Sequence, residues 1–199
     1  MVRLAIGILG SGKGSNCRAI LEAIREGRLQ ADARIVISDV RGAGILAIAE
    51  EFGVPAAVLP SAQWRTRYAP EEEDELVRLL RGAGVRLVVL AGFMRILKAP
   101  MLTAFPRRII NIHPSLLPKH PGREAWAQAL AAGENVTGCS VHFVDAGIDT
   151  GAVIAQREVP IKPNDTANSL HDRIQLAERE LYPQVIGELA GRLGAGSAS

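Results

Sequence analysis

Aromatic residues and net charge are both scarce in this sequence. Phe, Trp and Tyr together make up 4% of the 199 residues, and the formal net charge is only +2 at pH 7. Proteins that bind nucleic acid normally carry a strong basic patch, and those that hold single strands also offer aromatic stacking surfaces. The composition therefore argues against a nucleic-acid partner.

Cysteine and long apolar runs are also lacking. The two cysteines, Cys17 and Cys139, have a spacing that fits neither a metal site nor a disulfide scaffold, so we expect reduced thiols and a cytoplasmic location. Cys17 lies near a predicted helix start, which favours a thiolate, but no nearby histidine supports a nucleophile. The sequence has no run of about 20 apolar residues and no signal-peptide cleavage pattern, so we expect no membrane association.

Hydrophobic residues make up 48% of the chain, enough to build a sizeable core. Patterns typical of strands fall at residues 2–9, 33–38, 54–59, 85–91, 109–113, 138–144 and 152–160. Patterns typical of helices fall at residues 17–27, 41–52, 71–81, 98–104, 124–132 and 165–193. This alternation predicts an α/β fold, a Rossmann-like and mostly parallel sheet flanked by helices, with an antiparallel C-terminal strand pair. We expect one domain over residues 1–193 and a flexible tail over residues 194–199.

A glycine-rich stretch, Gly10–Asn16, joins the first predicted strand to the first predicted helix. Backbone N–H groups and the helix dipole at such a junction favour a phosphate group. The dinucleotide-binding fingerprint fails because Ser15 stands where its third glycine belongs, and the Walker pattern fails because Gly14 occupies its Ser/Thr position. We interpret the stretch as a phosphate cradle of another type, with a plain tight turn as the alternative.

Two polar side chains, Asn111 and His113, interrupt an apolar run that ends at Pro114. Residues two apart in a strand project to the same face, so the amide and the imidazole should point into the same space. An amide can donate hydrogen bonds to a developing oxyanion, and an imidazole can exchange a proton near neutral pH. The pattern favours an active site, although a polar cap on a buried strand end stays open.

Four segments together resemble the phosphoribosylglycinamide formyltransferase family, the folate-dependent transformylases of purine biosynthesis. These segments are Gly12–Asn16, Ala91–Leu97, Asn111–Pro118, and Ser140–Val144 with Asp149. The resemblance runs along nearly the whole chain. It implies a formyltransferase domain with a phosphate-binding half over about residues 1–100 and a catalytic and folate half over about residues 101–193. It also implies transfer of the formyl group of 10-formyltetrahydrofolate to the amine of glycinamide ribonucleotide by a monomer or homodimer, without a metal.

The same resemblance assigns the site residues. Asn111 would donate to the oxyanion, His113 would stabilise that charge as an imidazolium, and Asp149 would hold and charge His113 and assist proton transfer. The ribonucleotide-binding set would be Gly12, Lys13, Gly14, Ser15, Asn16 and Glu178. The folate-binding set would be Met94, Arg95, Ile96, Leu97, Val144, Asp145, Ala146, Gly147 and Ile148. His142 is expected to be structural or to support the catalytic groups, and not to be catalytic itself. On spacing alone, Asp149 would be a turn-former.

Other functions remain as alternatives. A formyltetrahydrofolate deformylase would use water in place of the amine and normally carries an extra N-terminal domain. A methionyl-tRNA formyltransferase would need an extra C-terminal domain, for which we expect no room. A P-loop-like phosphotransferase needs a Ser or Thr after Lys13, and a nucleotide-binding module would not explain Asn111, His113 and Asp149 together.

Overall fold

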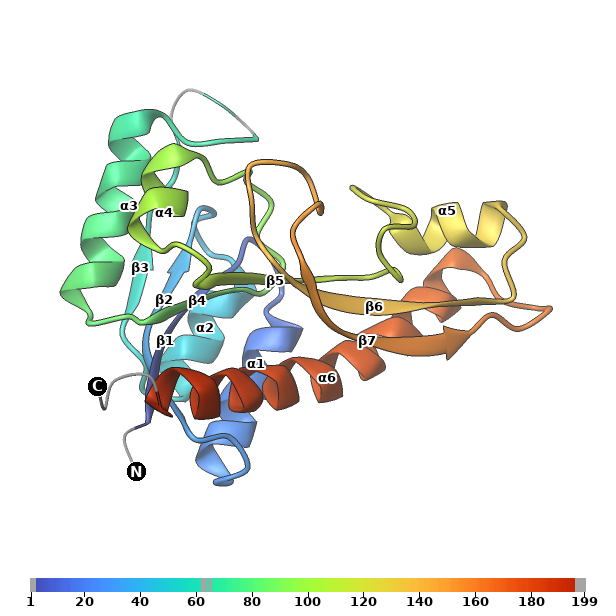
Figure 1. Ribbon diagram of the computed structural model, residues 1–199, viewed down its shortest axis with the longest axis horizontal. Helices are drawn as coiled ribbons and strands as arrows, with labels where there is room; N and C mark the ends of the chain where they lie inside the picture. The colour runs from blue at the N-terminus through green and yellow to red at the C-terminus, as the bar shows by residue number, and fades with distance from the viewer. Residues whose placement is uncertain (1–2, 62–63, 65, 196–199) are drawn as a thin grey trace.

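The computed structural model describes residues 3–61, 64 and 66–195, which form one seven-stranded sheet with helices on both faces (Figure 1). The strands are β1 (Leu4–Leu9), β2 (Ala31–Ser38), β3 (Ala56–Val58), β4 (Leu87–Leu90), β5 (Ile109–His113), β6 (Val136–Phe143) and β7 (Val153–Pro160). The helices are α1 (Ser15–Arg25), α2 (Gly44–Glu51), α3 (Pro70–Gly82), α4 (Ala99–Ala104), α5 (Ala125–Ala131) and α6 (Ala167–Ala195).

The strand order is β3-β2-β1-β4-β5-β6-β7. Neighbours from β3 to β5 are parallel, whereas β6 pairs antiparallel with both β5 and β7. The predicted α/β class, with its mostly parallel sheet and antiparallel C-terminal pair, is confirmed. The order reverses between β1 and β4, so the crevice beyond the carboxyl ends of these strands is the expected ligand position.

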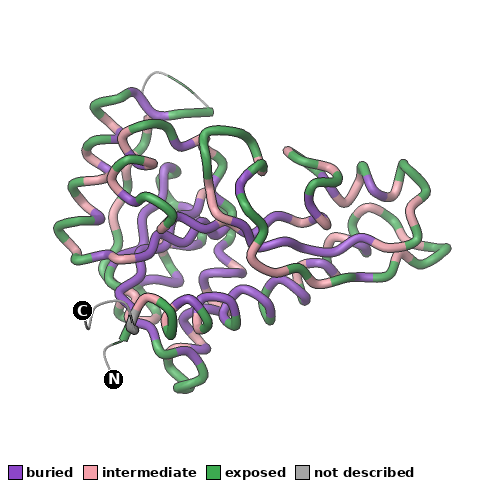
Figure 2. The backbone as a smooth tube through the Cα atoms, viewed as in Figure 1, coloured by how far each residue is buried: buried purple, intermediate pink, exposed green. Residues whose placement is uncertain are grey.

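Two hydrophobic clusters cover the two faces of the sheet. One packs α1, α2 and α6 against Ile6 and Ile8 of β1, and the other packs α3 and α4 against Leu9. Side chains of a strand alternate between faces, which is why adjacent residues of β1 join different clusters. Figure 2 shows the resulting layer of buried backbone along the central strands. The long helix α6 runs along one face beneath β6 and β7 toward the chain termini (Figure 1).

The ends of several elements differ from the prediction. Helix α1 begins at Ser15 instead of Cys17, because Gly14 takes a left-handed conformation with φ 82° and the helix starts directly after it. Helix α2 begins at Gly44 instead of position 41. Helix α6 continues to Ala195, so positions 194 and 195 of the expected tail are helical. Position 2, where the first strand was expected to start, and positions 196–199 lie outside the described residues.

No helix within residues 3–61, 64 and 66–195 combines the length and the apolar character needed to cross a membrane.

Tyr182 fastens α6 to the centre of the sheet. Its side chain is fully buried, and its hydroxyl lies 2.9 Å from the Leu90 carbonyl and 3.1 Å from the Ile110 carbonyl, to which it can donate. Replacing Tyr182 with phenylalanine should lower the free energy of unfolding by about 1–2 kcal/mol, because buried carbonyls lose their donor. Urea denaturation would measure this, with Tyr68→Phe, whose hydroxyl donates to the single carbonyl of Leu59, as the milder control. An unchanged denaturation midpoint would contradict this account of Tyr182.

Candidate active site

Three predicted catalytic side chains, Asn111, His113 and Asp149, gather at the carboxyl end of β5. Asn111 and His113 project from the same face of the strand, and the loop between β6 and β7 brings Asp149 back beside them. The His113 Nδ1 atom lies 3.3 Å from Asp149 Oδ2, and Nε2 lies 2.9 Å from the His120 carbonyl. A carbonyl only accepts, so Nε2 carries the hydrogen and Nδ1 of the neutral ring faces the carboxylate without one. A proton arriving at Nδ1 would bridge the ring to Asp149.

The protonation of this pair follows from its surroundings. Burial lowers the pKa of His113 below its usual 6.5, although the His120 carbonyl and the Asp149 charge oppose the shift. Burial alone would raise the pKa of Asp149, but contacts with His142, the Gly122 amide and His113 together hold that pKa below its usual value. The Gly122 amide donates to Asp149 Oδ2 at 2.9 Å. At neutral pH the pair therefore rests as a neutral imidazole beside a carboxylate, ready to accept a proton.

His142 lies between Asn111 and Asp149 and contacts both. It lies opposite Asn111 in the β5–β6 ladder, with Nε2 at 3.3 Å from Asn111 Nδ2 and 3.5 Å from Asp149 Oδ1. Its Nδ1 donates to the Phe143 carbonyl at 2.8 Å, which fixes the orientation of the ring. The sequence placed His142 near the site but did not predict that it would touch both groups. That contact depends on the antiparallel register of β5 and β6.

The loop that carries Asp149 is tightly folded. Asp149 itself has a left-handed backbone with φ 54°. A Cβ at Gly151 would lie 1.8 Å from the Phe143 carbonyl oxygen, so only glycine fits where the loop returns to β7. This close approach turns the loop back toward β5 and brings the carboxylate to His113.

The glycine-rich stretch forms the start of α1. Gly14 has no room for a side chain, since a Cβ there would lie 2.8 Å from the Ile45 Cα atom of α2. The first backbone bond within the helix runs from the Arg18 amide to the Gly14 carbonyl at 2.9 Å. Earlier N–H groups of a helix have no partner within the helix, and the exposed Lys13 adds a positive charge beside them. The geometry is suited to a phosphate.

Asn16 and Glu178 meet between α1 and α6. Asn16 Nδ2 donates to Glu178 Oε2 at 3.0 Å, and both side chains are buried. Burial raises the pKa of Glu178, a shift that the Asn16 bond and the Arg179 charge reduce. The Oδ1 atom of Asn16 is buried and has no hydrogen-bond partner among the described residues. A carboxylate and an unpartnered amide oxygen together form an acceptor pair that fits an amine.

The folate set divides into exposed and buried members. Met94 is 64% exposed and Ile148 is 55% exposed, unusual for large apolar residues, and Asp145–Ile148 are all exposed. Leu97, in contrast, is buried in the cluster beneath α3 and α4, and Val144 packs against that cluster. Exposed apolar side chains on both the β4 and β6 loops suit a flat, partly apolar ligand.

Arg95 does not present its guanidinium to this surface. The group is buried against Asp39 and the carbonyls of Trp64 and Arg67. No local pattern predicts this pairing, because Asp39 lies 56 positions away along the chain.

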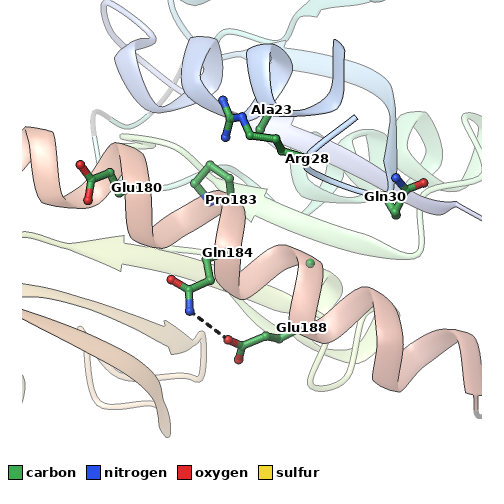
Figure 3. Close-up of a pocket in the computed structure, with 8 residues that line it drawn as sticks. Ala23, Arg28, Gln30, Glu180, Pro183, Gln184 and Glu188 are labelled. Carbon is green, nitrogen blue, oxygen red and sulfur yellow. Dashed lines mark hydrogen bonds between the residues drawn. The ribbon is translucent and has the colours of Figure 1, made fainter. Parts of the chain in front are cut away.

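Two cavities lie elsewhere. One of about 520 Å³ lies between the end of α1 and the middle of α6, with Arg28, Glu180 and Glu188 at its rim (Figure 3). Another of about 300 Å³ lies near the end of α6 and includes Arg107 and Arg192. None of the described residues lining either cavity belongs to the predicted catalytic, ribonucleotide or folate sets.

Cys17 is not an activated thiol. It is fully buried in the α1 core, and burial raises the pKa of its thiol to about 12 although nearby Arg18 opposes the shift. A thiol with this pKa is almost entirely protonated at neutral pH, which agrees with the prediction that Cys17 is no nucleophile.

Comparison with known proteins places this site in a family. The formyl transferase family model matches residues 4–186. Phosphoribosylglycinamide formyltransferase of Bacillus subtilis is 39% identical over 184 residues, covering 92% of this chain and 93% of that protein. Trifunctional purine biosynthetic protein adenosine-3 of Drosophila melanogaster is 44% identical over 189 residues, covering 94% of this chain but only 14% of that longer protein.

Solved structures agree with the sequence matches. The crystal structure of glycinamide ribonucleotide transformylase 1 from Symbiobacterium toebii matches with a TM-score of 0.91 at 46% identity, covering 95% of this chain and 88% of that one. The resemblance to phosphoribosylglycinamide formyltransferase and the predicted formyltransferase fold are thereby confirmed. Because the family model covers most of the chain, this protein belongs to the formyl transferase family.

Proposed function

We propose that this protein transfers the formyl group of 10-formyltetrahydrofolate to the amine of 5'-phosphoribosylglycinamide, giving formylglycinamide ribonucleotide and tetrahydrofolate in purine biosynthesis. The observation that carries the proposal is the convergence of Asn111, His113 and Asp149 at the end of β5. The phosphate-suited start of α1 follows β1, which β4 alone separates from β5 in the sheet. Family membership supports formyl transfer as the reaction.

The ribonucleotide is proposed to bind along the start of α1. The backbone amides of the first turn of α1, around Ser15, and the Lys13 charge would hold the phosphate. Glu178 and the unpartnered Oδ1 atom of Asn16 would accept hydrogen bonds from the amine. The amine held there would attack a formyl group placed at the end of β5, beside Asn111 and His113.

The chemistry needs charge stabilisation and one proton acceptor. Attack by the amine converts the formyl carbonyl to an oxyanion, to which the Asn111 amide can donate. The nitrogen that attacked then loses a proton, and the His113–Asp149 pair can accept it at Nδ1, directly or through water. On collapse, the folate nitrogen leaves and takes up a proton, which balances the one released. In this account His113 becomes the imidazolium that the family resemblance implies only as the reaction proceeds.

The folate is proposed to bind between the β4 loop, at Met94 and Ile96, and the loop over residues 144–148. A cytoplasmic location and a monomer or homodimer stay predictions. The buried, unpaired thiols of Cys17 and Cys139 support a reducing compartment.

Replacing Glu178 with glutamine should make the folded protein more stable at pH 7 but weaken its binding of the ribonucleotide. A carboxyl whose pKa is raised on folding stabilises the protein below its unfolded pKa near 4.5, and that contribution is lost as pH rises through the folded value. The glutamine variant should therefore melt above the wild type at pH 7, by about 2–4 °C for each kcal/mol gained, and the gap should close near pH 4.5. It should also raise KM for the ribonucleotide, because the amine loses an ionic acceptor.

Thermal melts from pH 4 to 8 and steady-state kinetics would measure both effects. A variant that is less stable than the wild type at pH 7, or that keeps the wild-type KM, would contradict this account of Glu178. Glu188→Gln, on an outer position of the same helix, is the matched control and should change neither quantity.

The test of the function is formyl transfer by the purified protein given both substrates, followed by the ultraviolet change of the folate. Turnover that depends on the ribonucleotide, with no added nucleoside triphosphate, would support the proposal. Folate turnover without the ribonucleotide would indicate a deformylase instead. The phosphotransferase alternative is disfavoured by Gly14, since the hydroxyl residue it requires would collide with Ile45.

A further inference from the structure

Arg95 is the centre of a buried cluster at the carboxyl edge of the sheet. Its Nε atom donates to Asp39 Oδ2 at 2.7 Å, and its Nη1 atom donates to the carbonyls of Trp64 at 2.6 Å and Arg67 at 3.0 Å. Its guanidinium lies 4.9 Å above the Tyr68 ring. The side chains of Arg95 and Asp39 are 8% and 5% exposed, so the pair is withdrawn from solvent.

These contacts join three separate loops. Asp39 follows β2, Trp64 and Arg67 belong to the segment before α3, and Arg95 follows β4. The backbone continues the link, because the Ile96 amide donates to the Thr66 carbonyl at 2.8 Å. A planar guanidinium with five N–H groups in a fixed fork can hold a carboxylate and two carbonyls at once. A lysine ammonium offers no comparable fork.

The cluster sits directly behind a surface proposed to bind folate. Met94, the neighbour of Arg95, is 64% exposed, and its amide donates to the Ser11 hydroxyl at 2.9 Å. Residue 94 therefore faces outward while residue 95 is fastened inward. A ligand on this surface would meet Met94 and Ile96, whose positions depend on where Arg95 is held.

We infer that Arg95, paired with Asp39, is a positioning residue that fixes the segment 94–97 for folate binding, and that its guanidinium does not itself contact the folate. This inference rests on the proposed function. It keeps Arg95 within the segment expected to bind folate but gives its side chain a positioning role.

The Asp39 side chain depends on Arg95 for its hydrogen bonding. Its Oδ2 atom is bonded to Arg95, whereas its Oδ1 atom is buried without a hydrogen-bond partner among the described residues. A buried charged pair of this kind is costly to break from either side, because the remaining partner stays buried and unpaired. Changing Asp39 should therefore displace Arg95 and reproduce the effect of changing Arg95 itself.

The experiment compares the wild type with Arg95→Met, Arg95→Lys and Asp39→Asn in steady-state formyl transfer. We expect KM for 10-formyltetrahydrofolate to rise about tenfold or more in all three, about the effect of losing one charge-assisted hydrogen bond. The value of kcat at saturating folate should stay within about threefold, because Asn111, His113 and Asp149 are untouched, and KM for the ribonucleotide should change less than KM for folate.

Arg78→Met is the matched control. Arg78 also forks onto a carboxylate, that of Glu75, with Nε at 2.6 Å, but this pair lies on the exposed face of α3. The control variant should keep both KM values. An unchanged folate KM in Arg95→Met would overturn the inference. A fall in kcat together with similar rises in both KM values would also overturn it, because that result would indicate general damage.

Two measurements keep the test decisive. If Arg95→Met does not fold, Arg95→Lys keeps the charge and decides the question. Hydrogen exchange should show faster exchange over residues 92–98 and 66–69 in the variants, with β1, β4 and β5 still protected. Tetrahydrofolate titrations of wild type and variants distinguish a failure of the proposed function from a failure of the inference about Arg95. A wild type without formyl transfer would end the proposed function, whereas equal tetrahydrofolate affinity in wild type and variants would end the inference about Arg95.

Discussion

Replacing His113 with alanine is expected to lower turnover by about two to four orders of magnitude, the range for loss of a general acid–base or oxyanion group. The imidazole is 5% exposed and is held between Asp149 and the His120 carbonyl, so its orientation is already fixed for proton exchange. Alanine removes both the proton acceptor and the positive charge that forms beside the oxyanion. Single-turnover kinetics with both substrates saturating would measure the loss.

A histidine away from the three catalytic candidates provides the control. His171 stacks on Trp126 with ring centroids 3.7 Å apart and contacts none of the three catalytic candidates. His171→Ala should keep turnover within a few-fold of the wild type. If His113→Ala retained near-normal turnover, His113 would have no catalytic role.

Asp149→Asn should be nearly as damaging, again by about two to four orders of magnitude in turnover. The Asp149 carboxylate faces His113 at 3.3 Å and His142 at 3.5 Å, and it accepts the Gly122 amide at 2.9 Å. Asparagine keeps the shape but carries no charge, so it cannot stabilise the imidazolium that forms when His113 accepts a proton. Binding of the ribonucleotide, which is proposed to involve other groups, should be retained.

The pH dependence of stability adds a second check on Asp149. A carboxyl whose pKa is lowered on folding stabilises the protein above its unfolded pKa near 3.8, and this contribution is lost as pH falls through the folded value. Asp149→Asn should therefore be less stable than wild type at pH 7, and the difference should shrink below pH 3.8. Asp32→Asn, an exposed carboxylate paired with Arg34, is the control and should leave turnover intact. Near-normal turnover in Asp149→Asn would remove Asp149 from the mechanism.

Some parts of the site could be read from the sequence because they depend on local rules. The period of two in a strand places Asn111 and His113 on one face. Glycines between a strand and a helix indicate a backbone that meets an anion, and Gly14 indeed takes the left-handed turn into α1. Asp149 was different, because its spacing suggested only a turn and the family resemblance alone pointed to it.

Other parts required the tertiary structure. His142 touches both Asn111 and Asp149 because of the β5–β6 register, which no local pattern reports. Glu178 would be judged a surface residue of a long helix, yet packing of α6 on α1 buries it against Asn16, 162 positions away.

The sequence by itself determined the α/β class, the phosphate-suited helix start and the polar pair on β5, since hydrophobic period, turn chemistry and strand alternation act over a few residues. The tertiary structure decided which distant groups lie within hydrogen-bond reach of one another, where Glu178 is buried and which way Arg95 points. Those outcomes depend on burial and on contacts between residues far apart in the chain. Arg95 shows the difference clearly: its place after β4 follows from the sequence, whereas its partner Asp39 becomes its neighbour only when β2, β1 and β4 align in one sheet.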